Sequence, residues 1–299
     1  MAVEEMLSQS TKPEVRNPVS TKKPEVRNKR RKKQMPRSFE LEYRVYPDAA
    51  AMSHAAAQHF VESTRAAVAA RGIARIAISG GSTPKASFAL LADPAQPYRA
   101  QVPWEKLEIY WVDERCVPPD HPESNYRMTR EALLEKVPVP AEQVFRMEGE
   151  LDPEQAAARY ESVIRRQFRL EGAQGPVFDM LDLGMGDDGH TASLFPHTAA
   201  INELGRIVVA NHVPQKDTWR ITLTWPVIVQ AHDLTFLIAG EAKADPLYRV
   251  LKGPYDPEEL PSQLIQPRSG KLLMLLDRAA AALLPAPGAD GRGVMEIAR

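Results

Sequence analysis

Short, continuous apolar stretches alternate along most of the chain with longer stretches in which apolar residues recur at helical spacing. The first pattern is typical of buried β-strands, and the second of helices that cover a sheet. The two alternate in regular order after Met35. We expect strands at residues 40–45, 73–78, 107–112, 180–183, 207–210, 220–224, 234–239 and 271–276, and helices at 48–71, 84–91, 126–134, 154–168, 241–252 and 277–284.

This order of elements predicts the class of fold. Strands that are separated by helix-length segments form βαβ units and a mostly parallel sheet, and right-handed crossovers place helices on both faces. We therefore predict an α/β protein with a Rossmann-like sheet. In such sheets, ligands bind beyond the carboxyl ends of the strands. The glycine-rich and acidic loops of this chain directly follow predicted strands, so we expect them to meet at that edge.

Composition limits the remaining possibilities. The chain has 299 residues, of which 43% are hydrophobic, so it can bury a large core. Its single cysteine, Cys116, excludes an internal disulfide framework and favours a reducing compartment. No apolar run is long enough to cross a bilayer, and the N-terminus lacks the pattern of a secretory signal. We expect a cytoplasmic protein, and the net charge of −1 predicts no overall attraction to nucleic acid.

The first 37 residues differ from the rest in charge and pattern. They contain 11 lysines and arginines against 4 glutamates, and the hexapeptide 12–17 recurs at 23–28. Such a charged, proline-broken segment buries too little apolar surface to fold. We predict a disordered basic tail at 1–37 and a single α/β domain at 38–299. A polyanion-binding arm and a start at Met35 are the two alternatives.

The loop that follows the second predicted strand suits a phosphate group. Gly80 and Gly81 allow backbone N–H groups to approach an anion closely, and Ser82 and Thr83 add hydroxyl donors. Thr83 is the expected N-cap of the next helix. The loop matches neither a dinucleotide fingerprint nor a P-loop. An ordinary tight turn between a strand and a helix is the alternative interpretation.

A second polar cluster, Asp113-Glu114-Arg115, follows the strand at 107–112. The Asp113 carboxylate is suited to contacts with protons or sugar hydroxyls, and the Arg115 guanidinium to contacts with an anion. A solvated cluster on a surface loop is the alternative.

The third loop carries the residues that best suit acid–base chemistry. Three glycines bend the segment 184–189 directly before His190, and Asp187 and Asp188 lie within it. Histidine is the side chain whose ordinary pKa suits base catalysis near neutral pH. Asp188 is a candidate to orient its ring. A structural histidine is the alternative.

Two basic residues complete the candidate site. Arg220 begins a predicted strand, and Lys243 lies in the first turn of a predicted helix. A cation in that turn opposes the helix dipole, which favours a role in ligand binding over one in helix stability. An ordinary surface lysine is the alternative.

Together these segments resemble the 6-phosphogluconolactonase family, in the order of that family and across nearly all of residues 38–299. They are 79–85, 112–115, 124–126, 183–196, 220–224 and 240–244. The tail has no counterpart there, and the closing segment 271–281 fits only loosely.

The resemblance implies a fold of the sugar-phosphate isomerase/deaminase type, a sugar-phosphate lactone as substrate, and neither a metal nor a cofactor. It implies that His190 is the base for water and that Asp113 and Arg115 lie near the sugar. It implies that the 6-phosphate is held by Gly80, Gly81, Ser82, Thr83, Arg220 and Lys243. We further expect a monomer that binds no specific nucleic acid and no membrane.

Three other functions fit these residues less well. A glucosamine-6-phosphate deaminase carries a catalytic Glu at the position that Phe195 occupies here. A sugar-phosphate-sensing regulator needs a DNA-reading module, and the tail has no helix-turn-helix pattern. A metal hydrolase built on Asp187, Asp188 and His190 lacks a second histidine at helical ligand spacing. The lactonase is the function that we predict.

Overall fold

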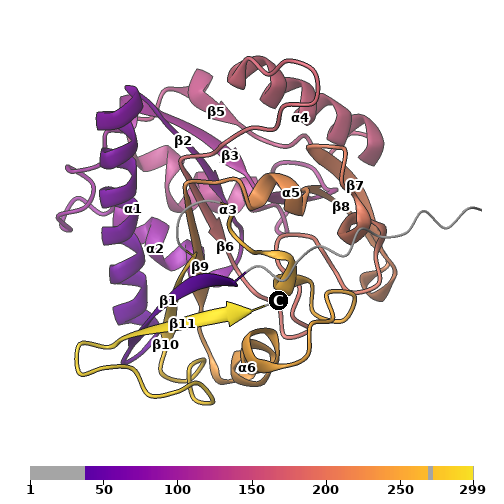
Figure 1. Ribbon diagram of the computed structural model, residues 1–299. Helices are drawn as coiled ribbons and strands as arrows, with labels where there is room; N and C mark the ends of the chain where they lie inside the picture. The colour runs from indigo at the N-terminus through magenta and orange to yellow at the C-terminus, as the bar shows by residue number, and fades with distance from the viewer. Residues whose placement is uncertain (1–37, 269–271, 299) are drawn as a thin grey trace, which may run out of the picture. The chain divides into compact units, whose positions relative to one another are not determined.

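A sheet of eight strands lies at the centre of the computed structural model, which describes residues 38–268 and 272–298 (Figure 1). All neighbouring strands are parallel except the edge strand β11, which runs antiparallel to β1. In spatial order the strands are β11 (Arg292–Ala298), β1 (Ser38–Tyr46), β10 (Leu272–Asp277), β9 (Asp233–Ile238), β6 (Met180–Leu183), β2 (Ala74–Ile78), β3 (Leu107–Trp111) and β5 (Val144–Phe145). The predicted mostly parallel α/β fold is confirmed.

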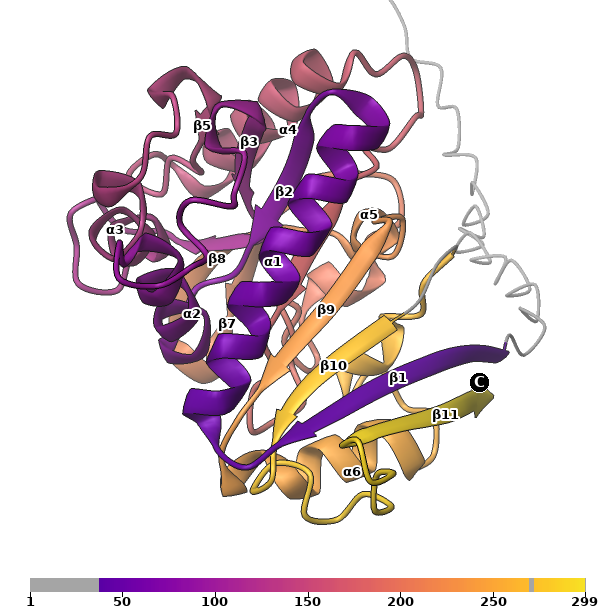
Figure 2. The ribbon, with the colours of Figure 1, turned by 90° about the vertical axis from the view of Figure 1, so that its left-hand side faces the viewer.

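Helices flank this sheet. The longest one, α1, lies across one face, and β7 and β8 lie on the opposite side (Figures 1 and 2). The α-helices are α1 (Ala49–Arg71), α2 (Ser82–Ala92), α3 (Asn125–Ala132), α4 (Pro153–Phe168), α5 (Trp225–Ile228) and α6 (Ala244–Lys252). None of the described helices is long and apolar enough to cross a membrane.

The ends of α1 follow from local chemistry. Asp48 is its N-cap and accepts a hydrogen bond from the N–H of Ala51 at 2.8 Å. Gly72 ends it with a φ of 77°, a left-handed conformation that glycine adopts without strain. The helix buries Met52 and Phe60. Its observed bounds, 49–71, are nearly the predicted ones, 48–71.

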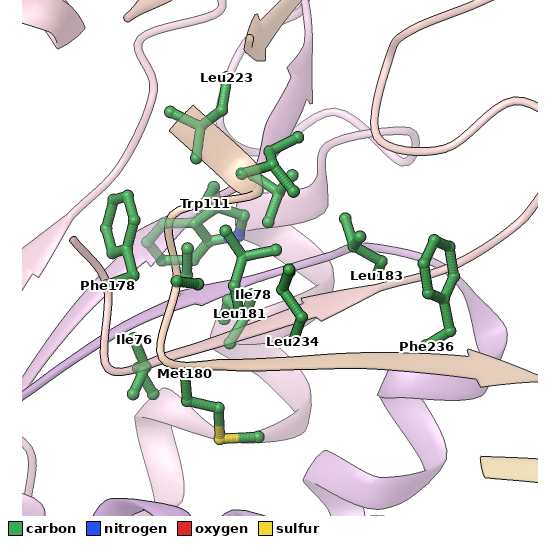
Figure 3. Close-up of a cluster of buried hydrophobic side chains, with 14 of the residues drawn as sticks. Ile76, Ile78, Trp111, Phe178, Met180, Leu181, Leu183, Leu223, Leu234 and Phe236 are labelled. Atoms are coloured by element: carbon green, nitrogen blue, oxygen red, sulfur yellow. The ribbon is translucent and has the colours of Figure 1, made fainter. Parts of the chain in front are cut away.

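The core lies between the sheet and its covering layers. Trp111 on β3, Ile76 on β2 and Phe236 on β9 are among the largest side chains that are fully buried (Figure 3). Close packing of this kind fixes the positions of the strand ends. The loops that leave those ends therefore start from rigid points.

A second, three-stranded sheet is antiparallel throughout. It consists of β4 (Asp113–Arg115), β8 (Thr218–Leu223) and β7 (Val208–Val213), in that order. The sequence predicted two of these strands but gave no sign that they pair as a hairpin. Asp113–Arg115 was expected as a loop and is instead an edge strand. The N–H of Leu223 donates to the carbonyl of Val112 at 2.8 Å, which links this sheet to the end of β3.

The C-terminal part differs most from the prediction. The segment 277–284, predicted as a helix, begins with the last residue of β10 and continues as consecutive turns at 278–283. The Asp277 carboxylate accepts N–H groups from Ala280 at 2.7 Å and from the distant Gly240 at 3.0 and 3.1 Å. Pro285 follows and disfavours helical backbone at the residue before it. The strand β11 was not predicted. Residues 1–37 lie outside the described residues, so the tail at 1–37 and the single domain at 38–299 remain predictions.

One buried acid gives the fold a testable dependence on pH. Asp182 on β6 is 5% exposed, and its Oδ1 has no hydrogen-bond partner among the described residues. Burial raises the pKa of Asp182 to about 7, with a further contribution from the charge of Asp233, against an opposing effect of His59. The folded state therefore keeps a proton that the unfolded state loses above about pH 4.

We expect Asp182→Asn to stabilise the protein, and more so at pH 8 than at pH 4.5. Ionisation of Asp182 reduces wild-type stability as pH rises from about 4 to about 7, by a few kcal/mol at roughly 1.4 kcal/mol per pKa unit. Asparagine removes that loss. Thermal melts of both proteins at the two pH values measure the effect. An equal gain at both pH values would contradict the raised pKa.

Candidate active site

A cavity with a volume of about 580 Å³ lies at the carboxyl ends of the central strands. Its walls come from the loops after β2, β3, β6 and β9 and from the β7–β8 hairpin. Most of the predicted site residues line it. These are Gly80, Gly81, Asp113, Arg115, His190, Arg220 and Lys243. Segments that are far apart in the sequence therefore meet where the sheet topology predicted.

The glycine loop leads directly into α2. Gly81 is the N-cap, with a φ of 108° that L side chains rarely adopt. The predicted cap, Thr83, lies inside the first turn instead, because the helix begins at Ser82. Ser82 and Thr83 do not line the cavity, although their turn presents the positive end of the helix dipole on the same side as Gly80.

His190 forms a fixed pair with Asp188. Its Nδ1 lies 2.5 Å from Asp188 Oδ1, and its backbone N–H donates to the same oxygen at 3.1 Å. Partial burial works against ionisation of Asp188, but the hydrogen bonds and charge of His190 outweigh it and lower the pKa of Asp188 to about 2. When the ionised carboxylate accepts a hydrogen bond from Nδ1–H, Nε2 of the neutral ring is free to accept a proton.

Two further residues fix the ring of His190. Phe195 is buried and stacks on it, with a centroid distance of 4.0 Å and an interplanar angle of 25°. Gly186 lies so close that a Cβ there would be 2.1 Å from His190 Nδ1 and 2.6 Å from Asp188 Oδ1. Only glycine fits at this position. The ring therefore has little freedom to rotate away from the cavity.

Asp113 is held from two sides. Its Oδ2 accepts the hydroxyl of Ser193 at 2.6 Å, and its backbone carbonyl accepts the side-chain N–H of Asn125 at 3.0 Å. The side chain is 8% exposed and faces the cavity. Ser193 belongs to the same loop as His190, so this contact joins the acidic wall to the loop of the candidate base.

Arg115 and Arg220 are cross-strand partners on β4 and β8. Arg115 donates to the carbonyl of Glu123 at 2.5 Å, and Arg220 donates to Thr218 Oγ1 at 2.8 Å. Neither forms an ion pair with any carboxylate in the described ranges. Burial, together with the charge of Arg115, lowers the pKa of Arg220. Two adjacent, partly buried cations of this kind favour an anion between them.

Lys243, which lines the cavity, forms an ion pair with the exposed Asp187 at 2.5 Å. Asp187 is 69% exposed at its side chain, and Lys243 only 24%. Lys243 ends the 3₁₀ turn η6 (Glu241–Lys243), because α6 begins at Ala244, three residues after the predicted start of the helix at residue 241. Asp187 thus contacts Lys243, whereas Asp188 contacts His190. Nowhere in the described ranges do three or more His, Cys, Asp or Glu side chains converge as a metal site requires.

Several residues that line the cavity were not predicted as site residues from the sequence. Lys216 lies on the turn between β7 and β8, with its Nζ 5.8 Å from the ring centroid of Phe195. Glu123 and Thr218 also line the cavity. Isolated polar residues on loops give no sequence signal of their own. Asn125 lay within a motif that carried the resemblance, yet it received no role.

Comparison with known proteins agrees with this geometry. A model of the family glucosamine-6-phosphate isomerases/6-phosphogluconolactonase matches residues 47–274. A 6-phosphogluconolactonase from Synechocystis is 42% identical over 215 residues, which are 72% of this chain and 86% of that protein. One from Nostoc is 40% identical over 242 residues, or 80% of this chain and 97% of that protein.

A solved structure shows the same likeness. The structure of 6-phosphogluconolactonase from Trypanosoma cruzi is similar with a TM-score of 0.71 and 30% identity, and the match covers 84% of this chain and 99% of that one. The sequence identities and the coverage of whole relatives exceed what a shared fold alone requires. The chain belongs to the glucosamine-6-phosphate isomerase/6-phosphogluconolactonase family.

Proposed function

We propose that this protein hydrolyses 6-phospho-D-glucono-1,5-lactone to 6-phospho-D-gluconate, the lactonase step of the oxidative pentose phosphate pathway. The observation that carries the proposal is the His190–Asp188 pair, at 2.5 Å, on the wall of a cavity that also contains two adjacent arginines without carboxylate partners among the described residues. A base and an anion site in one cavity suit a phosphorylated ester. The proposal includes a cytoplasmic monomer.

The proposed reaction uses His190 twice. Nε2 takes a proton from water while the water oxygen attacks the lactone carbonyl carbon. The bond between that carbon and the ring oxygen then breaks, and the imidazolium returns its proton to the ring oxygen. Asp188 favours the imidazolium and holds the ring in the required tautomer. A lactone carbonyl is already electrophilic, so positioning and one base are sufficient.

In this proposal the phosphate lies among the glycine loop and the basic residues. Backbone N–H groups near Gly80 and Gly81, with the first turn of α2 at Ser82 and Thr83, supply donors. Arg220 and Lys243 supply charge, and Lys243 exchanges its exposed partner Asp187 for the phosphate. Asp113 and Arg115 then face the sugar.

The deaminase alternative is less consistent with the cavity. At the position where that chemistry needs a carboxylate, the Phe195 ring stacks on His190 and is 4% exposed. An apolar ring there supplies no proton-transfer group to a substrate amine. This observation supports hydrolysis of a lactone over removal of an amino group.

The test is release of 6-phosphogluconate from freshly made 6-phosphoglucono-δ-lactone, after subtraction of the spontaneous hydrolysis of the lactone. We expect a strong acceleration by the protein and no ammonia release from glucosamine 6-phosphate. A rate equal to the spontaneous one would refute the proposed function. Ammonia release would establish the deaminase instead.

Dialysis against a chelator should leave this activity unchanged. The proposed proton transfers and charge stabilisation use His190, backbone N–H groups and basic side chains, so no step requires a bound ion. The measurement is kcat/KM before and after treatment with EDTA. A loss that a divalent cation restores would show that the mechanism is incomplete.

A further inference from the structure

The middle residue of the Asp113-Glu114-Arg115 cluster points away from the cavity. Glu114 is 2% exposed, while its two neighbours line the cavity, as the alternation of side chains along β4 requires. Burial raises the pKa of the Glu114 carboxyl, against the backbone hydrogen bonds that it accepts. A buried carboxyl is costly unless it accepts hydrogen bonds. The donors to Glu114 all lie within the twelve residues that follow it.

Those partners form the start of α3. Glu114 accepts the N–H of Asn125 at 2.7 Å and of Tyr126 at 2.8 Å, and the hydroxyl of Ser124 at 3.1 Å. It also accepts the N–H of Arg115 at 2.8 Å. Ser124 is the N-cap of α3. Glu114 therefore fixes the first turn of this helix to β4, which sets the position of Asn125.

The side chain of Asn125 lies between two walls of the cavity. Its Nδ2 donates to the carbonyl of Asp113 at 3.0 Å and lies 3.4 Å from Asp113 Oδ1. Its Oδ1 lies against the glycine loop, since a Cβ at Gly80 would be only 1.7 Å from that oxygen. The carboxamide thus spans the gap between the strand of Asp113 and the loop after β2.

Asn125 lines the cavity, but very little of it is accessible to a substrate. Asn125 is 2% exposed, and its Oδ1 is buried without a hydrogen-bond partner among the described residues. A Cβ at Gly80 would collide with this oxygen, so the loop can lie here only with glycine at that position. The two donor hydrogens face the acceptors on Asp113, which also fixes the orientation of the carboxamide.

We propose that Asn125, held by Glu114, is a positioning residue that sets the distance between Asp113 and the Gly80–Gly81 loop. If the loop holds the phosphate and Asp113 faces the sugar, this distance fixes where the lactone carbonyl lies relative to His190. The kinetic consequence rests on the function proposed above. The structural consequence, a loop that is ordered by Asn125, does not.

Asn125→Asp is the sharpest test because it keeps the shape and replaces the donor. The new carboxyl is buried beside Asp113 and Glu114, and burial with two like charges nearby raises its pKa. Ionised at pH 8, it faces the acceptors on Asp113 without a proton. Protonated near pH 5.5, it can again donate to the Asp113 carbonyl.

We expect kcat/KM of Asn125→Asp to be about tenfold or more below wild type at pH 8, and within about threefold near pH 5.5. The ratio to wild type at each pH removes the pH dependence that both proteins share. Amide hydrogen exchange of Gly80, Gly81 and Ser82 should be about tenfold faster in the variant at pH 8. This second measurement needs no substrate.

Gln230→Glu is the matched control. Gln230 is partly buried, donates its Nε2 to the carbonyl of Pro226 at 2.7 Å, and precedes β9 at the end opposite the cavity. It should show a flat activity ratio and unchanged exchange in the loop. Unchanged exchange in Asn125→Asp, or an activity ratio that does not vary with pH, would overturn the positioning role. An inactive wild type would refute the proposed function and leave the exchange result to decide this inference.

Discussion

Replacement of His190 by alanine should lower kcat by roughly 10²–10⁴ while the fold and the affinity for product remain near wild type. The ring is the only group in the proposed mechanism that takes a proton from water. Its Nε2 is available because Nδ1 is bound to Asp188 at 2.5 Å. The side chain is 24% exposed, so its removal opens no large buried cavity. Measurements of kcat, thermal midpoint and 6-phosphogluconate affinity together test this expectation.

The matched control is His232→Ala. His232 is exposed and lies before β9, at the far end of the strand from the cavity. It should leave kcat unchanged. Near-native turnover in His190→Ala would remove this residue from the mechanism. A large fall in the thermal midpoint would instead show that the stack with Phe195 and the contact with Gly186 serve mainly the fold.

Replacement of Arg220 by alanine should reduce kcat/KM on the phosphorylated lactone by about 10- to 150-fold, which corresponds to a charge-assisted contact of about 1.5–3 kcal/mol. The same variant should lose little on unphosphorylated gluconolactone, because that substrate brings no anion to Arg220. The wild type should strongly prefer the phosphorylated substrate. Kinetics of both proteins on both lactones isolate the contact with phosphate.

Arg292→Ala controls for the loss of an arginine elsewhere. Arg292 is exposed on the edge strand β11 and contacts no part of the cavity. Its replacement should leave kcat/KM unchanged on both lactones. Equal losses on both lactones in Arg220→Ala would mean that Arg220 acts on the sugar or on the strand β8, and that the phosphate lies elsewhere.

Much of the site was predictable because its residues lie in short sequence segments that directly follow predicted strands. The loops after β2, β3 and β6 follow strands that are buried enough to be read from runs of apolar residues. Parallel topology then brings the carboxyl ends of those strands to one edge. His190 and Asp188 are two residues apart, so their pairing needs only the bent glycine backbone between them. The resemblance to a known family rested on the same local segments.

Other features depend on contacts that no periodicity records. The β7–β8 hairpin pairs with β4 through the register of Arg115 and Arg220, which are distant in the sequence. Lys216 reaches the cavity only because that hairpin folds over Phe195. Asn125 is held in place by Glu114, which lies on β4, and it contacts Gly80, which lies on the loop after β2. Each is a consequence of where separate elements are packed.

The sequence by itself determined the α/β class, the edge of the sheet that forms the cavity, and most of the charged and histidine side chains that line it. Apolar spacing reports burial within one element, and turn residues report where an element ends. The tertiary structure decided the second sheet, the strand β11 and the turns at 278–283, which follow Asp277 and its hydrogen bond from the distant Gly240. These depend on the partner that an element finds, and a partner far along the chain leaves no periodic trace.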